Sequence, residues 1–111
     1  MAGVDKFAEI VKRVLSDVEA YVPVQEGIRK ECVFDDVCGH YQLLQIGWKH
    51  QRRIHGTLVH VDIRDGKVWV EHDGTNLEIV QDLLDAGIPQ ECMVLGFHPP
   101  ELRHLTEFAV G

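Results

Sequence analysis

One segment of this sequence constrains the fold more than any other. Residues 54–73 contain two runs of alternating aliphatic residues, separated by Asp65-Gly66. Strict alternation is typical of a strand with one buried face, and Asp-Gly is a preferred pair for the two-residue type I′ turn of a hairpin. The sequence therefore predicts an antiparallel β-hairpin over residues 54–73.

The hydrophobic pattern also predicts the register of this hairpin. A two-residue turn places Ile63 opposite Val68 and Val61 opposite Val70, so that the aliphatic side chains share one face. The residues of this face are Val59, Val61, Ile63, Val68 and Val70. A slip of one residue would bring the carboxylate of Glu71 into the face, which disfavours that register.

The opposite face of the predicted hairpin is polar, with His60 opposite Glu71 and Asp62 opposite Trp69. One imidazole and two carboxylates supply part of a metal site, so a metal-dependent enzyme using His60, Asp62 and Glu71 is one hypothesis. A second histidine is missing from the face, because the same register turns His72 to the aliphatic side. A polar cross-strand pair is the preferred interpretation, and we predict no metal or cofactor.

The segment before this hairpin predicts one helix and two strands. Apolar residues recur with helical spacing over residues 7–18, while residues 28–35 and 41–48 have the character of strands. Both faces of the second strand are expected to be at least partly covered. Residues 49–53 are expected to form a polar loop before the hairpin begins.

The segment after the hairpin predicts a second helix and a short strand. Thr75 and Glu78 have the spacing of a capping box, and Gly87 is well placed to end the helix that follows. Residues 93–97 predict a strand, and residues 101–105 a last helical turn.

The expected fold is therefore α+β. Its sheet is an antiparallel four-stranded meander, extended by a short fifth strand and covered by an N-terminal helix and a second helix. Residues 1–111 are expected to form a single domain.

Composition limits the partners that such a domain can take. Acidic residues outnumber basic ones 18 to 11, giving a formal charge of −7, so long-range electrostatics would repel nucleic acid and anionic membranes. Any contact with DNA is expected to be local or indirect. We expect no signal peptide, because charged residues interrupt the apolar residues near the start of the sequence, and no membrane span, because no apolar run is long enough. We therefore expect a cytoplasmic protein.

The sequence shows no catalytic signature. Ser16 is the only serine and lies on a predicted helix without a nucleophile elbow, and no HExxH or P-loop occurs. The odd set of Cys32, Cys38 and Cys92 has no CxxC pair, and all three lie among apolar neighbours. They are interpreted as reduced core thiols, and the chain is not expected to be an enzyme.

Two segments are candidate contact surfaces. The basic residues Lys49, Arg52 and Arg53 follow Trp48 closely, and their donors suit phosphate or an acidic partner surface. The simpler interpretation of this segment is a solvated turn.

The second candidate is the apolar, proline-containing segment of residues 95–110. Leftover apolar surface there would mark a protein interface, with Phe97, His98 and Pro99 as contacts. The alternative is that this tail completes the core.

As a set, eight segments of the chain resemble the XisI family, the fdxN element excision controlling factors of cyanobacteria. They cover nearly the whole chain in order, and one departure is Asn76, where an acidic residue is expected after Asp-Gly-Thr. The segments are Tyr41-Gln42-Leu43-Leu44, Gly47-Trp48, Arg52-Arg53, His60-Val61-Asp62-Ile63, Asp65-Gly66-Lys67-Val68-Trp69, Asp73-Gly74-Thr75, Leu95-Gly96-Phe97-His98 and Thr106-Glu107-Phe108-Ala109-Val110.

The resemblance implies a role in regulated excision of a DNA element, together with a site-specific recombinase and a neighbouring protein, XisH, which resembles nuclease-type folds. It implies no known catalytic residues. Many members occur in genomes without that element, so the family name can describe one use of a more general activity. We therefore expect a non-enzymatic regulator that binds an XisH-like protein, with a recombinase complex or a second copy as further partners. Direct DNA binding through residues 49–53 is the alternative.

Overall fold

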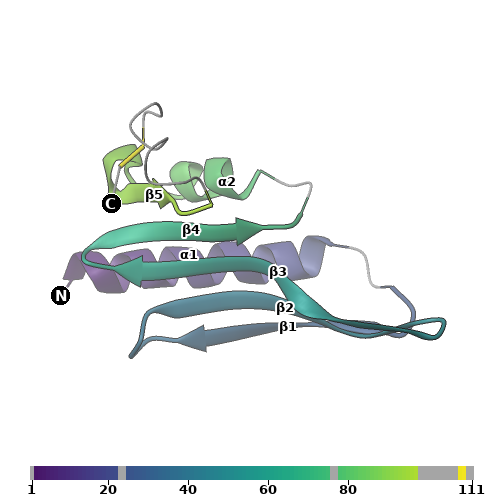
Figure 1. Ribbon diagram of the computed structural model, residues 1–111. Coiled ribbons are helices and arrows are strands. Elements are labelled where there is room, and N and C mark those ends of the chain that lie inside the picture. The colour runs from purple at the N-terminus through teal and green to yellow at the C-terminus, as the bar shows by residue number, and fades with distance from the viewer. Residues whose placement is uncertain (1, 23–24, 76–77, 98–107, 110–111) are drawn as a thin grey trace.

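The computed structural model describes residues 2–22, 25–75, 78–97 and 108–109, which contain two α-helices and a five-stranded sheet (Figure 1). In chain order the elements are α1 (Ala2–Tyr21), β1 (Ile28–Asp35), β2 (His40–Lys49), β3 (Arg52–Arg64), β4 (Lys67–Asp73), α2 (Ile79–Asp85), the 3₁₀ turn η1 (Gln90–Cys92) and β5 (Met93–Leu95). Neither described helix is both long and apolar enough to cross a membrane.

The strands lie in the order β1-β2-β3-β4-β5, so sequential neighbours are also spatial neighbours. The first three pairings are antiparallel, as the meander predicts, whereas β5 pairs with β4 in parallel. A parallel pair needs a crossover, and α2 lies in the connection from β4 to β5. The predicted fifth strand is thus confirmed, and its direction follows from the helix before it.

One face of the sheet is covered by the helices, because the predicted apolar stripe of α1 packs against it. Figure 1 shows α1 running along the strands. The buried core combines α1 and α2 side chains with the aliphatic face of β3 and β4. Its fully buried members include Val11, Leu15, Leu43, Val59, Val61, Val68, Val70 and Ile79.

The predicted turn of the β3–β4 hairpin is confirmed. Asp65 and Gly66 have φ angles of 55° and 76°, the pair of positive values that a type I′ turn requires. Ile63 pairs with Val68, and Val61 with Val70, as the aliphatic pattern predicts.

Beyond Val61 the predicted register is wrong, because β4 contains a bulge. The pairing shifts there, so that His60 lies opposite His72 and Glu71 is the extra residue. The expected pair of His60 with Glu71 does not form. The Glu71 carboxylate lies instead beside Gly96, where an added Cβ would collide with it.

The predicted polar loop over residues 49–53 is also wrong, because strand pairing continues almost to its end. Lys49 pairs with Arg52, leaving a two-residue turn in which His50 has a φ angle of 58°. A bulge at Leu58 shifts the register farther along the hairpin. Figure 1 shows the resulting long β2–β3 hairpin extending past the end of α1.

The predicted capping box does not form. α2 begins at Ile79 with Glu78 as its N-cap residue, and the cap has no side-chain hydrogen bond. The Asp73 carboxylate accepts hydrogen bonds from the Thr75 amide and hydroxyl, at 3.0 and 2.7 Å. Thr75 therefore belongs to a local turn around Asp73 rather than to the helix.

The end of α2 matches the prediction. Gly87, at a φ angle of 117°, donates its amide to the Leu84 carbonyl at 3.1 Å, and Ile88 donates to the Leu83 carbonyl at 3.1 Å. These two bonds define a Schellman motif, and the buried Ile88 supplies its apolar contact.

The described part of the C-terminal segment packs against the edge of the sheet. The Ala109 amide donates to the Met93 carbonyl at 2.9 Å, and Phe108 packs against the core. The helical turn predicted over residues 101–105 lies outside the described residues.

Candidate functional site

The end of the β2–β3 hairpin is a surface of exposed side chains. We call residues 48–53 the hairpin tip, and each of these six residues is exposed. Trp48 pairs directly with Arg53, so the two side chains emerge on the same face of the hairpin. Trp48 is 53% exposed, whereas Leu44 and Ile46 on the same face of β2 are partly buried, so the predicted partial cover of this face ends before the hairpin tip.

Trp48 and Arg53 contact each other. The guanidinium carbon of Arg53 lies 5.2 Å from the centroid of the indole ring, within the range of a cation–π interaction. An Arg53 guanidinium N–H also donates to the Gly47 carbonyl at 3.4 Å. These contacts hold the two side chains together while leaving them accessible to a partner.

The hairpin tip is basic on an acidic protein. Lys49, Arg52 and Arg53 are its charged residues, and no ion pair found among the described residues includes them. The four residues predicted here from the sequence are therefore brought together at one end of the molecule. Their charges are available to an acidic group from outside.

The residues of the second predicted contact surface, the segment 95–110, differ in how far they are buried. Phe97 is 47% exposed, whereas Leu95 is buried and Phe108 packs against the core. His98 and Pro99 lie outside the described residues. For Leu95 and Phe108, the alternative that the tail completes the core is the correct one.

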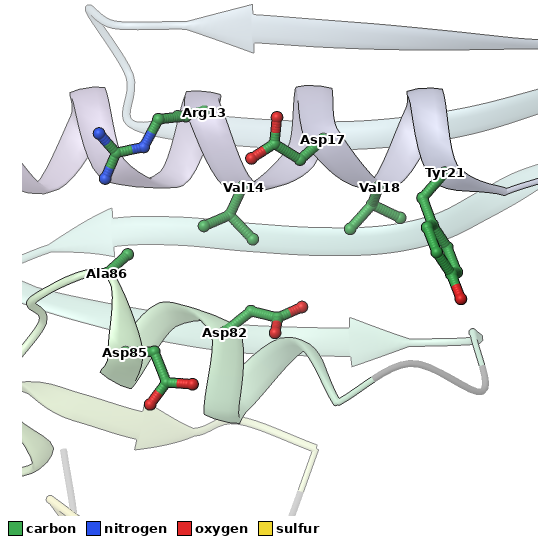
Figure 2. A pocket seen from close by; sticks show the side chains of 8 residues that line it. All are labelled: Arg13, Val14, Asp17, Val18, Tyr21, Asp82, Asp85 and Ala86. Carbon is green, nitrogen blue, oxygen red and sulfur yellow. The ribbon is translucent and has the colours of Figure 1, made fainter.

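A pocket of about 570 Å³ lies between the two helices (Figure 2). Figure 2 shows Val14 and Val18 pointing from α1 toward α2, with Tyr21 at one end. The polar lining is mostly acidic, and the complete lining consists of Arg13, Val14, Asp17, Val18, Tyr21, Asp82, Asp85 and Ala86. Three carboxylates beside one guanidinium offer no nucleophile and base in contact, so we assign this pocket no chemistry.

A cluster of polar side chains occupies the helix-free face of the sheet. The imidazoles of His40 and His60 both contact one carboxylate oxygen, Asp62 Oδ1, at 2.8 and 2.7 Å. The hydrogen bond to Asp62, reinforced by the carboxylate charge, raises the pKa of His40 above its ordinary value. Glu71, predicted as part of this group, is displaced by the β4 bulge.

His40 is the member that the sequence argument missed. It lies directly opposite Asp62 across the β2–β3 pairing. Matching the apolar residues Tyr41 and Leu43 to Val61 and Val59 would have found it, because this register places His40 beside Asp62.

The cysteines are free thiols in different environments. Cys32 packs against the core, and its burial, with a smaller contribution from Glu19, raises the pKa of its thiol to about 12. Cys38 is exposed, so its predicted place in the core is wrong. It lies in the β1–β2 turn, where the Asp35 carboxylate accepts its backbone amide at 3.1 Å.

Comparison with known proteins gives a consistent result over nearly the whole chain. The model of the XisI family, described as XisI protein, matches residues 1–110. Among solved structures, a XisI-like protein from Anabaena variabilis ATCC 29413 is 30% identical, with a TM-score of 0.93, over 97% of this chain and 99% of that one. The fdxN element excision controlling factor XisI from the same organism is 31% identical, with a TM-score of 0.85, over 98% and 99% of the two chains. No curated protein matches the chain.

Proposed function

Because this chain belongs to the XisI family, we propose that it is a non-enzymatic regulatory protein that controls excision of a DNA element. The main support is its similarity, over almost the full length of both chains, to a protein named as an fdxN element excision controlling factor. The side chains agree with a role other than catalysis. Ser16, the only serine, lies on the exposed side of α1.

We further propose that the regulation works through a protein partner resembling XisH, and that the hairpin tip contacts this partner. The observation that supports the hairpin tip as the contact surface is the exposed pair of Trp48 and Arg53, held together by a cation–π contact. Tryptophan and arginine are the residue types that most often dominate the energy of protein interfaces. The positive charge of the tip would favour an acidic surface on the partner.

Co-expression with an XisH-like protein tests this proposal. The two chains are expected to leave a size-exclusion column together, in a peak that elutes before either chain alone. Each protein purified separately and run at the same concentration provides the control. A chain that always elutes apart from the XisH-like protein would contradict the proposed partner.

The hairpin tip also supports a second candidate function, direct binding to DNA. Lys49, Arg52 and Arg53 are exposed donors for phosphate groups, although the net charge of −7 opposes the approach of DNA. If this function is correct, the protein will slow the migration in a gel of DNA fragments that contain the ends of the element, at low salt. Arg52→Ala would then weaken binding by a similar factor on every sequence. The absence of a mobility shift at low salt would exclude this candidate.

A further inference from the structure

We propose that His40, His60 and Asp62 form a binding site for a divalent first-row transition-metal ion such as Zn²⁺. These three residues are the one group among the described residues whose ligand atoms gather closely enough to share an ion. The site lies on the helix-free face of the sheet. It is separate from the hairpin tip and does not depend on the proposed regulatory function.

The strand register holds the three ligands in place. His60 and Asp62 are two residues apart on β3 and therefore project from the same face, and β2 brings His40 directly opposite Asp62. The donor atoms of the three side chains all lie within 4.8 Å of one another. Because each residue belongs to a paired strand, the backbone already provides the arrangement that an ion needs.

An ion at this site requires the three side chains to adjust. Ligand atoms bound to one zinc ion at about 2.0–2.2 Å stand roughly 3.0–3.5 Å from each other. The two imidazole nitrogens are now 2.8 and 2.7 Å from Asp62 Oδ1 and within 4.8 Å of each other. An ion therefore requires the two contacts to Asp62 to lengthen by a few tenths of an ångström, with the nitrogens roughly 3.0–3.5 Å apart. The His40 side chain is 53% exposed, so solvent rather than packed side chains borders much of it.

The donor set suits a transition metal. Two imidazoles and one carboxylate are a ligand combination that binds zinc and iron in proteins, and they leave further coordination positions open. The side chains of His40 and His60 are 53% and 29% exposed, so water can reach those positions. The Asp62 side chain is only 12% exposed, and its nearly buried negative charge favours a cation beside it.

Charges of both signs surround the group. Asp35 lies opposite His40 in the β1–β2 pairing, so a second carboxylate stands on the adjacent strand. Trp69 lies opposite Asp62 on the other side, in β4. The strand neighbours therefore add one carboxylate and an aromatic ring, and the guanidinium of Arg64 stacks on that ring, 3.8 Å from its centroid.

The test is a calorimetric titration of the purified, metal-stripped protein with Zn²⁺. The wild type is expected to bind one ion per chain. His40→Ala is expected to weaken binding by roughly 100-fold, since losing a direct ligand costs at least as much as losing an outer-sphere partner. The control is His55→Ala, which removes another exposed histidine of β3 and should leave the affinity unchanged.

Titration with Co²⁺ gives an independent readout, because ligation by nitrogen and oxygen changes its visible absorption. The wild type and His55→Ala should both show the changed spectrum, and His40→Ala and His60→Ala should not. Circular dichroism establishes that each variant is folded. Equal Zn²⁺ affinity in the wild type and His40→Ala, or no saturable binding of one ion by the wild type, would overturn the proposal.

Discussion

Replacing Leu43 with alanine is expected to lower the free energy of unfolding by about 2–5 kcal/mol, the usual range for a buried leucine. Leu43 is fully buried at the centre of β2, between Cys32 of β1 and Val59 of β3. The loss combines the apolar area removed with the cavity left beneath α1. Unfolding by urea, followed by circular dichroism, measures it.

Leu44 provides the matched control, because it is the same side chain one residue farther along β2. It points to the helix-free face and is only partly buried. Leu44→Ala is therefore expected to lower the free energy of unfolding by only about 1 kcal/mol, because Leu44 buries less apolar area than Leu43. A larger loss for Leu44→Ala than for Leu43→Ala would show that the two faces of β2 are assigned the wrong way round.

Gly47→Ala is expected to destabilise the protein by about 3 kcal/mol, at the upper end of what overpacking usually costs. Gly47 pairs with Ile28, and an added Cβ would collide with the Gly27 carbonyl oxygen and the Ile28 Cα. Both are backbone atoms, and the same Gly27 carbonyl accepts the Trp48 amide at 2.9 Å. The clash can therefore be relieved only by separating β1 from β2. Thermal unfolding measures the loss.

Gly56→Ala is the control for this change. Gly56 lies on the neighbouring strand β3, and an added Cβ would meet nothing within 4 Å. The alanine should leave stability unchanged or raise it by about 0.5 kcal/mol, because it restricts the unfolded chain. Equal losses at Gly47 and Gly56 would contradict the close approach of β1 and β2.

Local sequence patterns predict the parts of the fold that depend on neighbouring residues. The stripe of α1, the Asp65-Gly66 turn and the pairs next to that turn follow from spacing alone. The Schellman motif at Gly87 is equally local. Each feature satisfies its own hydrogen bonds or buries its own apolar face within a few residues of sequence.

The strand pairings that the sequence did not predict depend on single extra residues. Leu58 and Glu71 each shift a strand pairing by one position. Because side chains alternate between faces, such a shift decides which residues meet on a sheet. The four residues Trp48, Lys49, Arg52 and Arg53 could be grouped from the sequence because they are almost consecutive. The group of His40, His60 and Asp62 was incomplete because the bulge at Leu58 lies between the turn and His40.

The most direct test of the account is the affinity of an XisH-like protein for the wild type, Trp48→Ala and Tyr21→Ala. Both variants remove an exposed aromatic side chain, one from the hairpin tip and the other, 73% exposed, from the pocket between the helices. Trp48→Ala is predicted to weaken binding at least about tenfold, as expected for an interface hot spot, while Tyr21→Ala binds like the wild type. Unchanged binding by Trp48→Ala would contradict the assignment of the hairpin tip as the partner surface.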